Sequence, residues 1–258
     1  MGKIIALANQ KGGVGKTTTA INLAASLVAL DKRVLVVDAD PQGNASSGLG
    51  IDLRTLTNTI YECMINGEDT KDALAHTEMS NLDVLPSNIN LVGAEVEMLQ
   101  MENREMVLRK ILAQVKDDYD FILIDCAPSL GIITVNALAA ADSVLIPVQC
   151  EYFALEGIAK LLNTTKIVTS KLNTALKIEG FVMTMYDARL RLANQVVDDV
   201  RKNFGDLSFE TIIQRNVKLT ESTSFSRPVI LYDADSKGAL NHLQLAQELL
   251  DRQDKKKK

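Results

Sequence analysis

A glycine-rich segment that contains two lysines stands close to the beginning of the sequence. It lies between an apolar run and a helix-period stretch, and it consists of Lys11, Gly12, Gly13, Val14, Gly15, Lys16, Thr17 and Thr18. Glycines there let the backbone turn its N–H groups onto phosphate oxygens, and the following helix adds its positive end. Lys16 is expected to reach the β- and γ-phosphates of a nucleoside triphosphate, and the Thr17 hydroxyl to bind Mg²⁺. The segment therefore predicts a phosphate-binding loop.

Carboxylates follow two apolar runs of strand length. Asp38 comes directly after residues 34–37 with Asp40 two residues further on, and Asp125 comes directly after residues 121–124. Ligands of open α/β sheets bind at the carboxyl ends of the strands, where a carboxylate either orients water or holds a metal ion. The run that ends in Asp125 has the Walker B pattern, so we expect Asp125 to hold a water of the Mg²⁺ shell. Simple strand capping is the alternative for Asp38 and Asp125.

Apolar runs of strand length alternate with helix-period stretches and must position these groups. The predicted strands are residues 4–8, 34–37, 82–85, 121–124, 143–147 and 178–183, and the predicted helices are residues 16–30, 107–115, 132–141, 155–170, 193–203 and 238–251. Several strands are apolar without alternation, which indicates cover on both faces. The pattern predicts one α/β domain over residues 1–258, a doubly wound, mostly parallel sheet with helices on both faces. Residues 55–105 are less regular, and we expect them to form a helical excursion from the sheet.

Composition limits the class of protein. The chain has 258 residues, of which 47% are apolar, enough for a sizeable core. Cys63, Cys126 and Cys150 are far apart, which favours reduced, buried thiols. No apolar run reaches the roughly 18 to 20 residues that cross a bilayer, so we expect a cytoplasmic protein. Because the net charge is −5, any contact with DNA must come from a local basic patch.

The phosphate loop departs from the usual pattern at its first glycine, whose position is occupied by Gln10 and followed by Lys11. This form resembles the deviant Walker A motif, K-G-G-x-G-K-T, of the ParA and MinD family of P-loop ATPases. The resemblance implies an ATP-bound homodimer in which Lys11 touches the phosphates of the partner subunit. A second cation there offsets charge that develops on the transferred phosphoryl group. An exposed loop lysine is the alternative.

The same resemblance assigns roles to the carboxylates. Residues 38–42 match the D-x-D-P-Q segment of the family, which implies that Asp40 positions the attacking water and that Asp38 supports the Mg²⁺ environment. Residues 126–129 resemble the switch segment that senses the γ-phosphate. The three segments together predict an Mg²⁺-dependent ATPase with Lys11, Lys16 and Asp40 in catalysis.

Within this family the chain is most similar to the small chromosomal-type ParA proteins, the Soj group. The matching stretches are residues 8–19, 38–50, 125–129, 147–157, 184–189 and 215–221. Proteins of this group bind DNA without sequence preference once ATP has dimerised them, and a ParB-type centromere-binding protein stimulates hydrolysis and releases them. The resemblance therefore implies a nucleoid-associated DNA-segregation protein.

The resemblance also suggests which residues contact DNA. Arg189 is the first candidate, and Arg215 and Lys218 lie in a second matching segment. A dimer doubles the phosphate contacts, so nucleotide control of DNA binding follows. For each of these residues an ordinary solvated charge is the alternative. Gln214 replaces a proline that the family places before this segment, which leaves Asn216 as no more than a candidate contact for the base.

Two other functions compete with this interpretation. A MinD-like membrane ATPase needs a terminal amphipathic helix with a basic face, but residues 238–251 contain Glu248 and Asp251. The lysines of residues 255–258 are expected to form a solvated tail. A metabolic enzyme on the same scaffold, such as an ATP-dependent ligase or an iron–sulfur carrier, is the second rival. A carrier needs clustered thiolates, and the spacing of the cysteines does not supply them.

Overall fold

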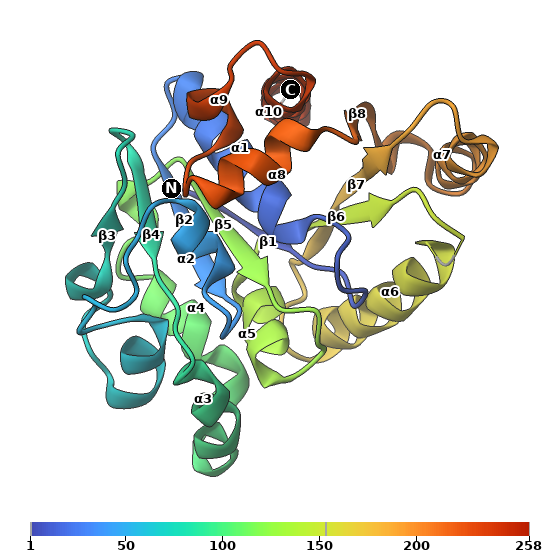
Figure 1. The fold of residues 1–258 in the computed structure, drawn as a ribbon. Helices are drawn as coiled ribbons and strands as arrows, with labels where there is room; N and C mark the ends of the chain where they lie inside the picture. The colour runs from blue at the N-terminus through green and yellow to red at the C-terminus, as the bar shows by residue number, and fades with distance from the viewer. Residues whose placement is uncertain (1, 153, 258) are drawn as a thin grey trace.

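An eight-stranded sheet forms the centre of the molecule (Figure 1). The structure is a computed structural model that describes residues 2–152 and 154–257. The strands are β1 Lys3–Leu7, β2 Val34–Ala39, β3 Ala75–His76, β4 Leu82–Leu85, β5 Phe121–Cys126, β6 Ser143–Gln149, β7 Lys177–Tyr186 and β8 Ser208–Gln214. Their order is β3-β4-β2-β5-β1-β6-β7-β8, and within the described chain all neighbours pair in parallel except β3 with β4. The predicted doubly wound, mostly parallel sheet is confirmed.

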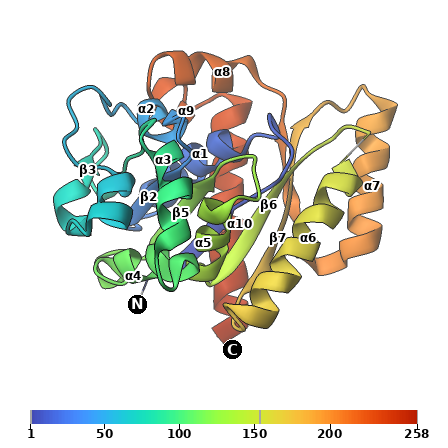
Figure 2. The same cartoon turned by 90° about the horizontal axis from the view of Figure 1, so that it is seen from below.

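Helices cover both faces of this sheet (Figure 2). The α-helices are α1 Lys16–Ala29, α2 Asn44–Gly48, α3 Leu91–Glu97, α4 Val107–Leu112, α5 Ile132–Ala140, α6 Ala154–Lys171, α7 Arg191–Phe204, α8 Val217–Ser224, α9 Val229–Tyr232 and α10 Lys237–Lys257. Helices α1 and α10 pack on one face, and α3 to α7 pack on the other. In β1, Ile4 and Ala6 belong to one core, whereas Ile5 and Leu7 belong to the other. Burial on both sides explains why this strand is apolar without alternation.

The structure differs from the sequence-based prediction at both edges of the sheet. Strand β8 was not predicted, because Glu210, Thr211 and Gln214 interrupt its apolar pattern. Strand β3 has two residues, too few for a periodic signal. Residues 55–105 do contain short helices, but they also supply β3 and β4 to the sheet. Helix α10 continues to Lys257, so the lysine run begins inside the helix; Lys258 lies outside the described residues.

The sheet brings the predicted carboxylates together. Strand β5 lies between β1 and β2, and its register pairs Asp125 with Leu7 on one side and with Asp38 on the other. The loop that follows β1 is the phosphate loop. Because parallel strands end at the same edge, one face of the molecule receives the loop and both strand-end carboxylates.

Candidate nucleotide site

The phosphate loop adopts the conformation that its glycines predict. Gly13 and Gly15 have φ angles of 72° and 86°, in the left-handed region that residues with a Cβ avoid. Helix α1 begins at Lys16 without a side-chain cap, so its first backbone N–H groups face the loop. The Thr184 hydroxyl donates to the Val14 carbonyl over 2.8 Å and ties the loop to β7. The result is a cleft of about 350 Å³ lined by loop residues together with Asp40, Gln42, Asn44 and Pro128.

Lys16 is buried at the base of this cleft, with 6% of its surface exposed. Its Nζ donates to the carbonyl oxygen of Lys11 over 3.2 Å. Burial lowers the pKa of Lys16, while the nearby Asp125 acts in the opposite direction. A neutral carbonyl is a weak partner for a buried ammonium, and phosphate oxygens would give it a charge-assisted one. The geometry therefore suits the phosphate role predicted for Lys16.

Lys11 lies at the rim of the loop, and its side chain is 33% exposed. Its Nζ pairs with Glu151 Oε2 over 3.2 Å, and Glu151 follows β6. The backbone N–H of Lys11 donates to Asn9 Oδ1 over 3.0 Å, which fixes the start of the loop. Lys11 therefore points away from its own phosphate cleft and is held by an exchangeable surface ion pair.

Asp125 is fully buried, and neither of its carboxylate oxygens has a hydrogen-bond partner among the described residues. Burial raises the pKa of Asp125 well above its usual range and Asp38 adds to the effect, whereas Thr17 and Lys16 oppose it. A buried carboxylate without hydrogen-bond partners is costly unless a cation, or a water bound to that cation, interacts with it. No cluster of three or more His, Cys, Asp or Glu side chains in the described chain could hold a metal ion alone. A magnesium ion here would thus rely on Thr17 and on phosphate oxygens.

Asp38 is equally buried but has partners. Its Oδ2 accepts from the backbone N–H and the hydroxyl of Ser46, over 2.8 and 2.7 Å, and its Oδ1 accepts from the N–H of Asp40 over 3.2 Å. Burial raises the pKa of Asp38 to about 6, although the bonds from Ser46 lower it. These contacts hold α2 and the segment that carries Asp40 against the end of β2. Ser46 was missed by the sequence analysis, since nothing local marks its pairing with Asp38.

Asp40 is half-buried and lines the phosphate cleft. Its Oδ1 accepts from the backbone N–H of Gln42 over 3.0 Å. No hydrogen bond to its Oδ2 occurs within the part of the chain that the structure describes, so this oxygen is free to accept from a water in the cleft. The water-orienting role of Asp40 stays a prediction that this position permits.

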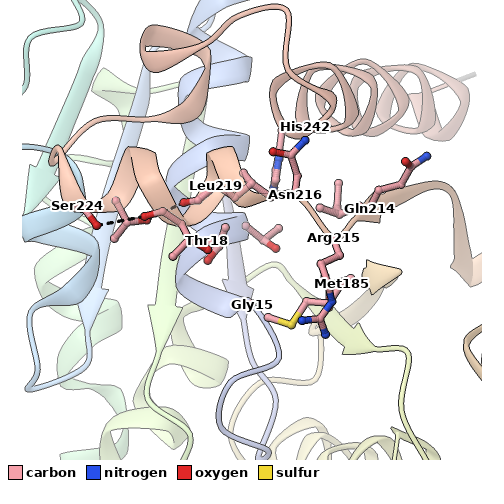
Figure 3. A pocket seen from close by; sticks show the side chains of 14 residues that line it. Gly15, Thr18, Met185, Gln214, Arg215, Asn216, Leu219, Ser224 and His242 are labelled. Carbon is pink, nitrogen blue, oxygen red and sulfur yellow. Dashed lines mark hydrogen bonds between the residues drawn. The ribbon is translucent and has the colours of Figure 1, made fainter. Parts of the chain in front are cut away.

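A second cleft, of about 430 Å³, continues from the phosphate loop (Figure 3). Both clefts are lined by Gly15, Thr18 and Met185. Met185 has a φ of 51°, a conformation that a side chain with a Cβ adopts only when its surroundings impose it. The size and continuity suit a base and ribose whose phosphates occupy the loop. Asn216 lines this cleft as the sequence suggested, but its Oδ1 already accepts from the N–H of Lys218 over 2.8 Å and caps α8.

His242 of α10 lines the same cleft and was not among the predicted site residues (Figure 3). It is fully buried, and its Nδ1 lies 2.8 Å from the carbonyl oxygen of Gly238. Because a carbonyl accepts, Nδ1 carries the hydrogen and Nε2 is a bare acceptor, with no partner among the described residues. Burial lowers the pKa of His242 to about 4, so the ring is neutral near pH 7. The sequence predicts a helix over residues 238–251, but it predicts neither the burial of His242 nor the orientation of its ring.

Of the candidate DNA-binding residues, Arg215 follows β8 and lines this cleft, whereas Arg189 follows β7 and Lys218 lies in α8 (Figure 3). The Arg189 guanidinium donates two hydrogen bonds, of 2.9 and 2.6 Å, to the carboxylate of Asp187. These hydrogen bonds lower the pKa of Asp187 to about 2. Arg215 is exposed, and its N–H donates to the carbonyl of Tyr186 over 2.9 Å. Lys218 is half-buried and pairs with Glu221 over 2.8 Å. The fold brings Arg189 and Arg215 together around Asp187, whereas Lys218 is engaged within α8.

Comparisons with known proteins agree with this geometry. Residues 2–178 match a family described as an AAA domain. The chain is 54% identical over 252 residues to the chromosome partitioning protein ParA of Myxococcus xanthus, covering 98% of this chain and 89% of that one. It is also 54% identical over 252 residues to the chromosome-partitioning ATPase Soj of Treponema pallidum, covering 98% of each. A solved structure described as cobyrinic acid a,c-diamide synthase from Mycobacterium smegmatis, with bound ADP and magnesium, is 36% identical with a TM-score of 0.86. It covers 98% of this chain and 96% of that one.

The parallel sheet, the glycine loop at the head of α1 and the buried strand-end carboxylates define a P-loop ATPase. Its second loop lysine places it among those with a deviant Walker A motif. The chain belongs to the Soj and ParA family of chromosome-partitioning ATPases. No helix in the described residues is long and apolar enough to cross a membrane.

Proposed function

We propose that this chain, as a single domain over residues 1–258, separates DNA molecules through a cycle driven by ATP. Two subunits bind Mg-ATP and dimerise around it, and the dimer binds DNA without sequence preference. Hydrolysis, stimulated by a ParB-type centromere-binding protein, dissolves the dimer and releases the DNA. The protein would act in the cytoplasm on the nucleoid. The names of its relatives, a partitioning protein and a partitioning ATPase, support this cycle.

The observation that carries the proposal is the position of Lys11. It stands in the phosphate loop, yet its side chain turns outward to Glu151 and stays 33% exposed. An exposed ion pair contributes about 0.2–1 kcal/mol, so Lys11 can leave Glu151 at little cost. A triphosphate presented by a second subunit offers Lys11 a more highly charged partner. The outward lysine is therefore suited to complete a neighbouring site.

The residues of the phosphate cleft fit an Mg²⁺-dependent hydrolysis. When bound, Mg²⁺ would supply charge that neutralises the phosphates, held by Thr17 and by a water on Asp125. Asp38 would keep the segment of Asp40 in place through Ser46, because it bonds the N–H of both residues. Asp40 would orient the attacking water, and Lys16 would hold the β- and γ-phosphates. Lys11 of the second subunit would offset the charge that develops in transfer.

Arg189, Arg215 and Lys218 would carry the contacts to DNA. Asp187 neutralises part of this surface, so one subunit offers few phosphate contacts. A dimer presents two such surfaces, and each added contact increases affinity and its dependence on salt. The direct test compares DNA binding of one preparation with ATP, with ADP and without nucleotide. Retention with ATP alone is expected, and equal retention in all three conditions would refute the proposal.

A ligase function deserves a second test because of the structure described as cobyrinic acid a,c-diamide synthase. ATP hydrolysis that requires cobyrinic acid and does not respond to DNA would favour it.

A MinD-like membrane function is disfavoured by α10, since its apolar residues Leu245 and Leu249 are buried in the core rather than free to contact lipid. Sedimentation with liposomes and ATP, without retention on DNA, would reverse that judgement.

A further inference from the structure

Helix α3 exposes aliphatic side chains on the face that points away from the core. Ile89, Val92, Val96 and Leu99 are 64%, 55%, 68% and 63% exposed. Val92 and Val96 lie in α3, Ile89 precedes it, and Leu99 lies in the turn Met98–Gln100. Their spacing of three, four and three residues places them in one line, which we call the apolar stripe. The opposite face of the same helix is fully buried in the core through Leu91, Ala94 and Met98. The helix is thus apolar on two faces, and one of them has no cover in the described chain.

A cleft lined by methionines follows the apolar stripe in the chain. Met101, two residues beyond Leu99, lines it together with Met64 and Met106, and its volume is about 430 Å³. Helix α3 contacts the π-helix Glu62–Asn66 that forms the other side, and the Tyr61 hydroxyl donates to Glu97 over 3.0 Å. Methionine side chains adapt to differently shaped apolar groups. The cleft can therefore accept an apolar anchor from a molecule that lies along the stripe.

The surroundings of the stripe are acidic. Residues 59–118 contain twelve Asp and Glu but five Lys and Arg. The remainder of the chain contains 21 acidic and 23 basic residues, so the negative charge of the protein resides in this segment. Glu95 and Glu97 flank the stripe, and Glu68 and Glu102 line the cleft; all four are exposed. Such a field repels nucleic acid and anionic membranes and attracts cations.

We propose that the apolar stripe and the methionine-lined cleft together bind a basic amphipathic helix of another protein. Aliphatic residues of the helix would cover the stripe, one longer apolar side chain would enter the cleft, and flanking Lys or Arg would face the glutamates. A second copy of this chain does not fit, because a twofold contact would bring one acidic surface against its equal. Binding needs no nucleotide, so it stands or falls separately from the ATP cycle.

A model peptide tests this surface on the full-length chain. The probe is a fluorescein-labelled synthetic helix of Leu and Lys, with the leucines at helical spacing. A peptide of the same composition whose leucines alternate serves as its control. Anisotropy at about 0.15 M salt gives the affinities. The protein variants are Val96→Ser with Leu99→Ser, and a matched control, Ile167→Ser, which removes a 57% exposed aliphatic side chain from α6.

The double serine variant is expected to bind the helical peptide at least about tenfold more weakly, because central apolar contacts carry most of an interface's affinity. Ile167→Ser should bind like the wild type. Glu97→Gln with Glu102→Gln should weaken binding at low salt and flatten its salt dependence. Thermal melts show whether each variant is folded. Equal affinities of the stripe variant and the Ile167 control, or of the two peptides, would overturn the proposal. So would self-association of the wild type that the stripe variant abolishes.

Discussion

Replacing Lys11 by alanine tests the proposed dimer most directly. In the described chain Lys11 pairs with Glu151, and in the proposed dimer it leaves that pair for the partner's phosphates. Removing it should therefore weaken dimerisation without emptying the phosphate loop, whose own cation is Lys16. The expected change is selective: monomers still bind ATP, but they associate poorly.

The size of the effect follows from the contacts exchanged. A charge-assisted bond between an ammonium and a phosphate contributes about 1.5–3 kcal/mol, and a twofold dimer makes two of them. Dimerisation also breaks the two ion pairs between Lys11 and Glu151, which offsets part of this gain. Each pair contributes about 0.2–1 kcal/mol, because the side chains of Lys11 and Glu151 are 33% and 49% exposed. The net cost of Lys11→Ala is about 1–6 kcal/mol. That weakens the dimer by between about fivefold and about ten-thousand-fold.

Sedimentation velocity with Mg²⁺ and a non-hydrolysable ATP analogue measures this change. Glu151→Gln is the matched variant, because it releases Lys11 instead of deleting it. The released lysine should leave the dimer unchanged or strengthen it by up to about 30-fold, since the two ion pairs together contribute at most about 2 kcal/mol. Only Lys11→Ala is thus expected to weaken the dimer. If Lys11→Ala dimerises like the wild type, or if Glu151→Gln dimerises more poorly, the reasoning is wrong.

Four further results are expected. Lys16→Ala should lower ATP affinity at least about tenfold in calorimetry, because it removes the buried cation at the phosphates. Asp40→Ala should give a dimer with ATP that persists in gel filtration and hydrolyses slowly; a monomer would exclude the water-orienting role. Arg189→Glu should weaken DNA retention while ATP dimerisation persists, and Asp187→Asn, which frees the arginine, should strengthen it; unchanged salt titrations of both would count against this patch. His242→Gln should remove a pH dependence of the unfolding free energy. The pKa of His242 is about 4 in the folded state and near 6.5 in the unfolded state. The stability that the neutral ring contributes is therefore present above pH 6.5 and is lost as the pH falls to 4. The difference in unfolding free energy between the two proteins should change by about 3 kcal/mol across that window, and a constant difference would contradict the burial of a neutral ring.

The sequence determined the parts of the site that depend on local chemistry. Gly13 and Gly15 are needed for the positive φ angles of the loop, and the loop directly precedes α1. The apolar run of β5 predicts a strand buried on both faces, with Asp125 at its end. These features need a few consecutive residues and a period, so they can be recognised without the fold.

Tertiary structure decided which distant groups meet. Ser46 bonds Asp38, Glu151 holds Lys11, and His242 of α10 reaches the cleft beside Gly15. Strand β8 is polar in places because it lies at the edge, which the sequence around it does not reveal. Likewise, the sequence of residues 55–105 favours a helical excursion but does not reveal that the second apolar face of α3 remains uncovered. Such outcomes depend on packing between segments far apart in the chain, and periodicity carries information about one segment at a time.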